Sequence, residues 1–507
     1  MDLLLNFLTP LLNPQLLLMV AIGTFAGIYV GAIPGLSVTM AVALLLSLTY
    51  SWDILPAIAL IIGIYTGGVY GGSRAAILLN IPGAPAAVAT TFDGYPLAQK
   101  GEAGKAMGLA TVTSVIGGMV GVFFLAFTTP AISQLALNFA HRDYFLLAFM
   151  GLLLVGSLSK GSFIKAVFVA FLGIIIGLVG LDNITATPRL TFGMLDLQRG
   201  FNIVVVILGI FGFSEVLYQM SKSISFTVVN KVGRIIPSLK TVIKYLPLSL
   251  QSSVIGVISG ALPGVGGEIA ALFSYDRAKK SVKNPSRPFG EGAYEGVVAP
   301  ETANNAAIGG ALIPMLTLGI PGDAVTAVII GAFVIHGLNP GPLMMTDSPD
   351  MFWVITGSLF LSNIFLLIFG IIGIKTFQKI VTIPKGILLP VITVLTIIGA
   401  YSINNSMTDI YWMIAFGFVG YFCRVFGFSI APLVLGVILG PLIDKSLRAS
   451  LIASQHNIGD FLLGFVTSPI SIVLLFITLF VLVSGTSPYK KMKALLVQKT
   501  RLLFKNE

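Results

Sequence analysis

Long apolar runs separated by short polar breaks extend from one end of the chain to the other. The runs measure about 15 to 25 residues, the length of helix that crosses the hydrocarbon core of a bilayer. The alternating segments of about ten residues that form membrane β-barrels do not occur. The pattern therefore predicts an all-α polytopic membrane protein.

Composition supports this class, because 56% of the 507 residues are hydrophobic and only 10% are charged. Ordinary soluble domains are roughly 25% charged. The net charge of +10 comes from short loops and a basic C-terminal tail, which indicates cytoplasmic topology signals and no nucleic-acid partner. Cys423 is the single cysteine, so an intrachain disulfide is excluded. The first residues lack the features of a cleaved signal peptide.

The first half opens with two apolar arms around Ile33-Pro34-Gly35, which predict a re-entrant hairpin over 15–50. A broken helix over 54–83 is expected next, interrupted at its paired glycines (67–68 and 71–72) and ending at Ile81-Pro82-Gly83. A polar loop should follow over 93–105. Further spans are predicted near 106–128, 143–158, 163–181 and 201–219.

After a basic segment at 222–244, the opening motifs return in the same order. The spacing Gly-x-x-x-Gly-Ala-x-Pro-Gly ends at Gly35 and again at Gly264, and Ile-Pro-Gly ends at Gly83 and again at Gly322. Two repeats are therefore expected, over 1–221 and 245–486, joined by the 222–244 linker and followed by a cytoplasmic tail at 487–507. The second repeat would contain a hairpin at 245–276, a broken segment at 296–322 and spans near 352–374, 387–401, 410–424, 428–440 and 463–485.

Basic residues indicate that the second repeat is inverted. Residues 1–53 contain no Lys or Arg, whereas the second hairpin is flanked on both sides by basic residues. Because Lys and Arg concentrate in cytoplasmic loops, the two hairpins should open from opposite sides of the membrane. This predicts about eleven crossings and two hairpins, with a periplasmic N-terminus and a cytoplasmic C-terminus.

The stretch from Ala299 to Ala311, which runs on to Gly322, combines a carboxylate, two adjacent amides, glycines and prolines within an apolar protein. Its prolines and glycines predict irregular backbone instead of a continuous helix, and such backbone is tolerated in a bilayer only where it lines a cavity. Helix ends beside Pro-Gly breaks would offer free N–H groups to an anion. Glu301, Asn304 and Asn305 are candidates for the coupling ion. The substrate-binding candidates are Pro34, Gly35, Ser37, Thr39, Ser73, Asn80, Pro82, Gly83, Pro263, Gly264, Gly266, Asn304, Asn305, Thr317, Pro321 and Gly322.

Other charged residues have two interpretations each. Glu301 either binds the coupling cation or pairs with a nearby donor at a helix end, and Glu268 either binds a cation or caps a helix. Asp323 is open to the same capping role, and Arg74 is either a clamp for a substrate carboxylate or a boundary residue. Three scattered histidines lack metal-ligand spacing, so no catalytic residue and no metal apart from Na⁺ is expected. They are His141, His336 and His456.

Several long motifs resemble the large membrane subunit of the tripartite tricarboxylate transporters, the TctA family. They are the segments 71–83, 93–104, 260–264, 295–314, 316–322 and 337–343. The resemblance implies a multi-pass protein of the bacterial inner membrane, which imports citrate-like di- and tricarboxylates or other organic anions with Na⁺ or H⁺. It also implies two partners, a small membrane subunit of about four helices and a periplasmic solute-binding protein, and no cofactor. Glu268 and Asp323 depart from the family pattern, which leaves the substrate and the coupling ion open.

Symport of an organic anion by elevator-type or rocking alternating access is the first hypothesis. The alternatives are an anion channel and uptake of an organic anion without carboxylates. An intramembrane enzyme would need a catalytic pair within hydrogen-bond reach, and the sequence offers no such pair. Glycine faces serve packing within a subunit as readily as between subunits, so a homodimer also stays open.

Overall fold

The computed structural model describes residues 7, 11–33, 36–158, 162–182, 184–221, 235–338, 340–374 and 385–485. The predicted site residues Pro34 and Gly35, most of the predicted linker and the tail at 487–507 lie outside these ranges. The chain forms two compact units, each built from two separate segments. The first unit joins 1–137 to 202–422, and the second joins 138–201 to 423–507.

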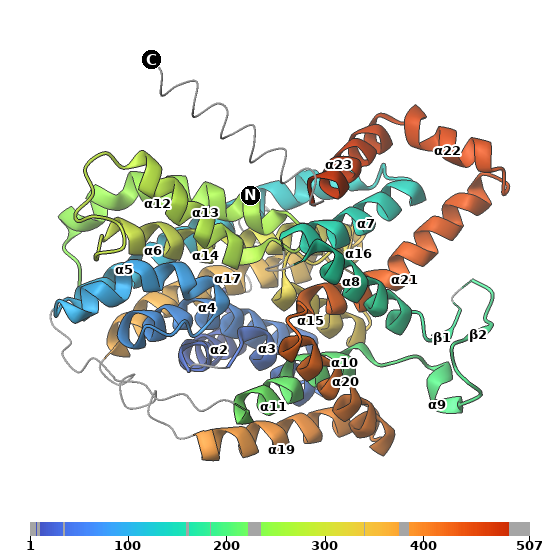
Figure 1. Ribbon diagram of the computed structural model, residues 1–507, viewed down its shortest axis with the longest axis horizontal. Coiled ribbons are helices and arrows are strands. Elements are labelled where there is room, and N and C mark those ends of the chain that lie inside the picture. The colour runs from blue at the N-terminus through green and yellow to red at the C-terminus, as the bar shows by residue number, and fades with distance from the viewer. Residues whose placement is uncertain are drawn as a thin grey trace. The chain divides into compact units, whose positions relative to one another are not determined.

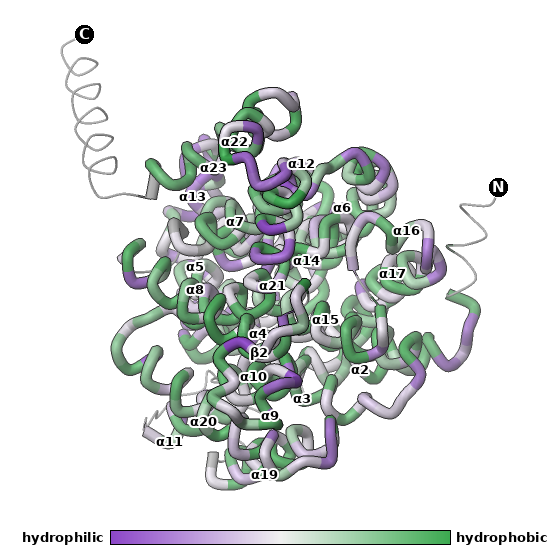
Figure 2. Tube along the Cα trace, turned by 90° about the vertical axis from the view of Figure 1, so that its right-hand side faces the viewer, coloured by the Kyte–Doolittle hydropathy of each residue, from purple (hydrophilic) through white to green (hydrophobic). Residues whose placement is uncertain are grey.

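Helices dominate both units. Eight described helices are long and apolar enough to cross a membrane, and a bent pair adds a ninth candidate. Most of the helical trace in Figure 2 is hydrophobic, and the hydrophilic residues gather mainly at turns and helix ends. The predicted all-α polytopic class is confirmed.

The first unit contains the helices on both sides of the predicted hairpins (Figure 1), and the first helix of each pair, α2 or α12, is long and apolar enough to cross a membrane. Its α10 and α11 continue one another through a π-helical segment, η2. The elements are α2 (Pro14–Ala32), α3 (Val38–Leu48), α4 (Ile54–Leu79), η1 (Pro85–Ala87), α5 (Val88–Gln99), α6 (Ala103–Ala136), α10 (Ile203–Ile207), η2 (Leu208–Phe213), α11 (Ser214–Met220), α12 (Leu239–Ala261), α13 (Gly266–Ser281), α14 (Glu295–Leu318), α15 (Ala324–Ile335), α16 (Met344–Asp347), α17 (Pro349–Ile372), α19 (Lys385–Asn404) and most of α20 (Met407–Val425).

The predicted interruption of α4 at its paired glycines is wrong, because the helix runs unbroken from Ile54 to Leu79. Its glycines serve close packing. Gly67 and Gly71 lie against the backbone of α2, and Gly72 lies against Ala84, so an added Cβ would meet backbone or side-chain atoms at each of them. Membrane helices use small residues in this way to bring their backbones into contact. The break comes only after Leu79.

The prediction of irregular backbone over 299–311 is also wrong. Those residues lie within α14, which continues through Pro300 and Pro314 to Leu318. Each proline removes one backbone hydrogen bond. The helix persists because a buried, water-free segment has no other partners for its remaining backbone groups. α14 is buried along almost its whole length between α6, α12 and α13, and it leaves the helical path only at Gly319.

Three further boundaries differ from prediction. The first residues of the expected 93–105 loop belong to α5, which packs against α4 and α14. The span expected at 428–440 extends to Ala453. The span expected at 463–485 is two helices that meet at Ser468 with a bend of 93°.

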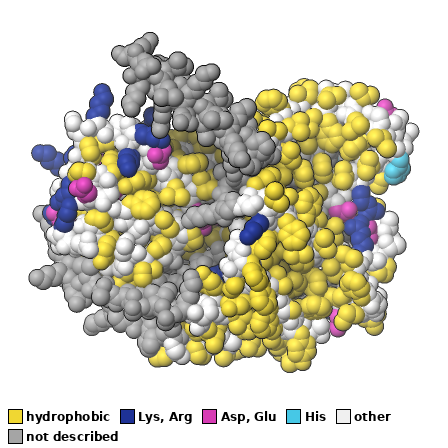
Figure 3. All heavy atoms as spheres, viewed as in Figure 1, with side chains coloured by type: hydrophobic (Ala, Val, Ile, Leu, Met, Phe, Trp, Pro, Cys, Tyr) yellow, Lys and Arg dark blue, Asp and Glu magenta, His cyan; other side chains and the backbone are white. Residues whose placement is uncertain are grey.

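The second unit consists of α7 (His141–Leu158), α8 (Phe163–Gly177), a two-residue hairpin β1 (Gly180–Leu181) and β2 (Pro188–Arg189), α9 (Leu195–Gln198), α21 (Ile430–Ala453), α22 (Ile458–Thr467) and α23 (Pro469–Gly485). α21 packs along α7 and α8, and α23 packs along α7. Figure 3 shows hydrophobic side chains over most of the visible surface of α7, α8 and α21, as expected for lipid contact.

A four-residue ion network ties the β-hairpin to α21 in the second unit. Asp182 pairs with Arg189 and Arg448, and both arginines also pair with Asp444, at 3.0 and 3.6 Å. The backbone N–H of Thr185, together with these arginines, holds the pKa of Asp182 well below its usual range. The network explains how charged residues within the C-terminal half of α21 are accommodated.

Candidate substrate and cation site

Two helix breaks of matching geometry lie in the first unit. α4 ends at Asn80 and α14 ends at Gly319, and both residues adopt the left-handed conformation, with φ of 57° and 69°. A left-handed residue releases the chain from the helix, and the proline two residues later prevents its return. Each break is followed by Ile-Pro-Gly, as the sequence predicted for the ends of these segments.

The two breaks dock onto the preceding helix pair in the same way. Gly83 lies against Gly31 of α2 and Gly72 of α4, and Gly322 lies against Gly260 of α12 and Ala311 of α14. In both places the backbones are too close to admit a side chain. The interhelical contacts that lead up to the breaks correspond as well: Gly27–Ile64 with Gly256–Ala303, Gly31–Gly68 with Gly260–Ala307, and Ile28–Gly71 with Val257–Gly310.

The tip between α12 and α13 joins the second break. The backbone N–H of Gly264 donates to the carbonyl of Gly322 at 2.7 Å. Gly264 and Gly266 both have positive φ, which only glycine adopts without strain. A Cβ on Gly266 would lie 3.1 Å from the Cβ of Asp323. Three predicted site residues, Gly264, Gly266 and Gly322, therefore come together, with buried Pro263 and Pro321 beside them.

Asp323 occupies the N-terminus of α15. Its Oδ1 accepts from the backbone N–H of Thr326 at 2.8 Å, and Thr326 Oγ1 accepts from the Asp323 N–H in return. The hydroxyl of Tyr65 donates to Oδ2 at 2.5 Å. The capping interpretation of Asp323 is confirmed. A carboxylate of this chain thus already lies at the helix end that was expected to receive the substrate anion.

The N-terminus of α13 has no side-chain cap. Its second residue, Gly267, lies against Oδ1 of Asn304 on α14. Ser37, by contrast, caps α3 by accepting from the Met40 N–H at 3.1 Å. Four helices of ten or more residues begin near the helix breaks and hairpin tips. Of these, α3 and α15 have a side-chain cap, whereas α5 and α13 have none.

Asn304 and Asn305 are buried where α14 crosses α4 and α13. The amide of Asn304 donates to the Val69 carbonyl at 3.4 Å, and that of Asn305 donates to the Glu301 carbonyl at 3.2 Å. Within the described ranges the Oδ1 atom of each accepts no hydrogen bond. The site therefore presents two buried amide oxygens, which are suitable acceptors for a cation or a hydroxyl group.

Glu301 lies one turn before Asn305 on α14 and is 1% exposed. Thr90 of α5 donates to its Oε1 at 2.5 Å, and Ser114 of α6 lies 3.3 Å from Oε2. Ser73 of α4 is a third hydroxyl neighbour. Sequence reasoning named Ser73 and missed Thr90 and Ser114. The only sequence signal for each was an adjacent hydroxyl residue, Thr91 or Thr113, in an apolar segment. The expected pairing of Glu301 with nearby donors agrees with these contacts, but Glu301 lies within α14 and not at a helix end.

The remaining predicted residues lie apart from Glu301, Asn304 and Asn305, or they form hydrogen bonds only within their own helix. Asn80 is exposed, and Pro82 is half-buried. The hydroxyl of Thr317 donates to Ile313 in its own helix, and Thr39 is buried in the first turn of α3. No described contact links these four residues to Glu301 or to the asparagines, so their predicted roles stay predictions.

Arg74 is buried at the end of α4 and caps another helix. Its Nη2 donates to the carbonyl of Gly370 at 2.5 Å, in the last turn of α17. A cation at a helix C-terminus interacts favourably with the helix dipole. This contact gives the buried Arg74 a partner within the protein, and both interpretations of Arg74, the substrate clamp and the boundary residue, stay predictions. Glu268 is exposed in the first turn of α13, and the described residues contain no group of metal-ligand type.

Sequence reasoning also missed a second buried carboxylate, Asp93 of α5, which holds the loop before α14. Its Oδ1 accepts from the backbone N–H groups of Gly290, Gly292 and Ala293 at 2.7 to 2.9 Å, and Tyr275 of α13 donates to Oδ2 at 2.9 Å. We call these five residues the Asp93 clamp. It joins the segment after the first break to the segment before α14.

A partly exposed ion pair continues this junction. Arg287 binds both carboxylate oxygens of Glu102 at 3.0 Å, and Tyr294 donates to Glu102 at 2.6 Å. The hydrogen bond from Arg287 lowers the pKa of Glu102 below its ordinary value. Burial and the bond to Glu102 raise the pKa of Tyr294 to about 12.

Comparison with known proteins agrees with this architecture. Residues 17–435 match the model of the tripartite tricarboxylate transporter TctA family. The chain belongs to the TctA family. Members of this family are transporter components and not enzymes. The TctA chain is a multi-pass membrane subunit that works with partner subunits.

Two relatives of this TctA chain come from Agrobacterium vitis. One, an uncharacterized 52.8 kDa protein in the TAR-I ttuC' 3' region, is 38% identical over 478 residues, which cover 94% of each chain. The other, an uncharacterized protein in the TAR-II ttuC' 3' region, is 44% identical over 220 residues, which cover 43% of this chain and 89% of the relative. No solved structure matches the chain.

Proposed function

We propose that this TctA chain is the large membrane subunit of a binding-protein-dependent secondary transporter that imports an organic anion by cation symport. Its partners would be a small membrane subunit and a periplasmic solute-binding protein, and it would lie in the bacterial inner membrane with its N-terminus periplasmic. The observation that carries the proposal is the pair of matching helix breaks, at the ends of α4 and α14, in the same unit that buries Glu301, Asn304 and Asn305.

The corresponding contacts of α2 with α4 and of α12 with α14 support an internal repeat. The opposite charge patterns around the two hairpins support its inversion. Inverted repeats with paired broken helices are typical of secondary transporters that bind substrate at the repeat interface. The division into two compact units, each drawing on both predicted repeats, supports alternating access of elevator type.

The charges of the cluster support coupling to a cation. Two carboxylates, Glu301 and Asp323, lie in or beside it, and neither forms an ion pair with any Lys or Arg that the structure describes. An organic anion entering this region alone would be repelled. A cation bound by the Glu301 carboxylate and the free amide oxygens, or a proton on Glu301, removes that repulsion. The uncapped N–H groups of α13 would then receive one anionic group of the substrate.

The same charges argue against an anion channel. A fixed anion pore is lined by cationic side chains or by helix N-termini. Here one helix N-terminus is already taken by Asp323, and a second carboxylate is buried nearby. Na⁺ and H⁺ are both compatible with the oxygen-rich surroundings of Glu301. The uncapped N–H groups of α13 are compatible with both carboxylate and non-carboxylate organic anions.

Uptake by proteoliposomes tests the proposal. The chain and its two partners are reconstituted, and a labelled organic-acid panel is offered with Na⁺ and pH gradients imposed separately. With 100 mV inside negative, each net positive charge carried inward supports about 50-fold accumulation. Flux that only equilibrates and ignores both gradients would contradict symport.

Glu301→Gln separates coupling from folding. Glutamine keeps the shape of the side chain and can still accept from Thr90, so the fold should survive. We expect exchange of substrate to continue while gradient-driven accumulation falls to equilibrium. Glu291→Gln, a matched change in an exposed loop, should accumulate substrate as the wild type does. If Glu301→Gln accumulates normally, Glu301 is not the coupling group.

A further inference from the structure

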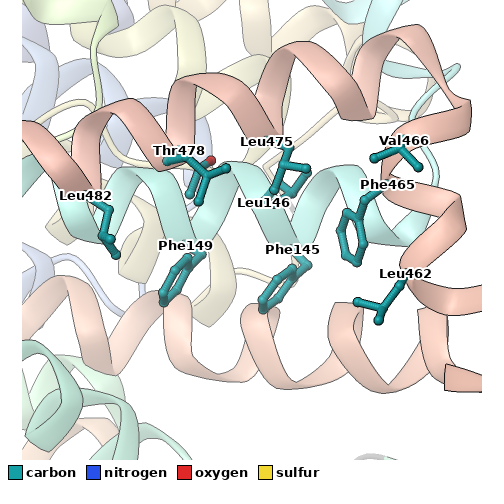
Figure 4. A pocket seen from close by; sticks show the side chains of 10 residues that line it. Phe145, Leu146, Phe149, Leu462, Phe465, Val466, Leu475, Thr478 and Leu482 are labelled. Carbon is teal, nitrogen blue, oxygen red and sulfur yellow. The ribbon is translucent and has the colours of Figure 1, made fainter. Parts of the chain in front are cut away.

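The second unit contains an apolar groove that the proposed transport mechanism does not use. It has a volume of about 420 Å³ and lies between α7, α22 and α23. Figure 4 shows the side chains that line it. Phe145 and Phe149 of α7 stack in parallel with ring centres 5.8 Å apart, and Phe465 of α22 closes one end. Leu475 and Leu482 of α23 line the facing wall.

The groove is shorter than one leaflet of a bilayer. Its lining on α23 runs from Leu475 to Leu482, about 10 Å at the rise of an α-helix. Half of the hydrocarbon core is about 15 Å. A spanning helix of a partner would need about three times the length of the groove, and the volume equals about one turn of a helix with its side chains. These dimensions fit part of one acyl chain from a single leaflet.

The end of the groove where α7 and α23 begin carries a guanidinium. The Nε of Arg142 donates to Ser471 at 3.1 Å, and Ser471 donates to the buried Asp143. Gly464 of α22 lies beside the Nη1 of Arg142, where an added Cβ would come within 3.0 Å. Among the ion pairs of the described residues, none includes Arg142. A half-buried guanidinium held by Nε keeps its outer N–H groups for a phosphate.

A carboxylate stands at the same end. Asp460 lies one helical turn before Gly464, so the two share a face of α22. α22 meets α23 at 93° and exposes Leu462 and Leu463, the arrangement of a helix that lies along the surface of the bilayer. The headgroup end of the groove therefore combines one guanidinium with one exposed carboxylate.

We propose that this groove binds one zwitterionic phospholipid that carries a primary ammonium. Its acyl chain occupies the groove, its phosphate contacts Arg142, and its ammonium faces Asp460. A headgroup with a phosphate and no ammonium is repelled by Asp460. A quaternary ammonium has no N–H to donate to the carboxylate. The site is independent of the transported substrate.

Lipid titration of the purified full chain, followed by native mass spectrometry, tests the site. Phosphatidylethanolamine, phosphatidylcholine and phosphatidylglycerol with identical acyl chains are compared. We expect phosphatidylethanolamine to bind about tenfold more tightly than either of the others, which corresponds to one charge-assisted hydrogen bond. Equal affinities for the three lipids, or a co-purifying protein chain that blocks lipid binding at the groove, would overturn the proposal.

Three variants locate the lipid. Arg142→Gln should weaken phosphatidylethanolamine about tenfold, and the matched Arg199→Gln, at an exposed arginine of the same unit, should change nothing. Asp460→Asn should abolish the preference over phosphatidylcholine. Leu479→Trp, at an exposed lining position, fills the groove and should weaken all three lipids alike. Asp460 and Leu479 are both exposed, so these changes test the site even if Arg142→Gln fails to fold; wild-type binding in both variants would refute it.

Discussion

Replacing Asp93 should loosen the junction in front of α14 more than any exposed charge change nearby. Asp93 is fully buried and accepts three backbone N–H groups and one hydroxyl. A hydrogen bond to a charged acceptor contributes roughly 1.5–3 kcal/mol, and one to a neutral acceptor roughly 0.5–1.5 kcal/mol. Asp93→Asn keeps the geometry and makes three of these bonds neutral. The expected loss is therefore about 3 kcal/mol.

Asp93→Ala should cost more, because it leaves the N–H groups of Gly290, Gly292 and Ala293 without their acceptor. Each buried donor left unpaired costs about 1–3 kcal/mol. The assay is thermal unfolding of the full chain in detergent, read as an apparent melting temperature because membrane proteins of this size often unfold irreversibly. Limited trypsin digestion after Lys283 reports on the loop itself, since the Arg287–Pro288 bond resists trypsin.

The matched control is Asp276→Asn, the same substitution at an exposed residue of α13 that pairs with Lys280. Such surface pairs contribute about 0–1 kcal/mol. We expect Asp93→Asn to lower the melting temperature by about 3–4 °C and to accelerate tryptic cleavage of the loop. A shift no larger than that of Asp276→Asn, with unchanged cleavage, would refute the assignment of the clamp.

Two further predictions concern packing and pH. Gly31→Ala and Gly260→Ala each place a Cβ into a neighbouring backbone, so both should destabilise the protein by about 1–3 kcal/mol, whereas Gly386→Ala has open space and should not. Melting temperatures in detergent measure these effects. A large difference between Gly31→Ala and Gly260→Ala would argue against equivalent packing of the two repeats. Because Arg287 lowers the pKa of Glu102 in the folded state, this pair should stabilise the protein above the ordinary carboxyl value of 4.5 and lose that effect as pH falls below it. Melting curves of wild type and Glu102→Gln should therefore converge at low pH, and a difference that grows on acidification would contradict the pairing.

Sequence reasoning was most successful where local composition decides the outcome. Apolar runs predicted the membrane class, since a bilayer accepts only segments that satisfy their own backbone. Pro and Gly marked both helix breaks at Ile81–Gly83 and Ile320–Gly322, because these residues restrict the backbone wherever they stand. The glycines of the repeated motif correspond in the structure as well, because Gly31 and Gly260 both lie against a neighbouring helix backbone.

The errors arose where a neighbouring segment decides. The glycines of α4 and the prolines of α14 were taken for breaks, but both helices continue through them, packed against α2, α12 and α13. The extension of α21 to Ala453 likewise follows no local rule. The bend at Ser468 does have a local cause, because Pro469 holds the preceding residue extended, and sequence reasoning missed it.

By itself, then, the sequence determined the membrane class, the helix breaks and the residue types available for a site. Only the tertiary structure decided that Thr90 and Ser114 bind Glu301, that Tyr65 reaches Asp323, and that Asp93 holds the loop before α14. The physical reason is that composition and backbone preference act within a few residues. These hydrogen bonds join atoms far apart along the chain, and only the packing of whole helices brings them within reach.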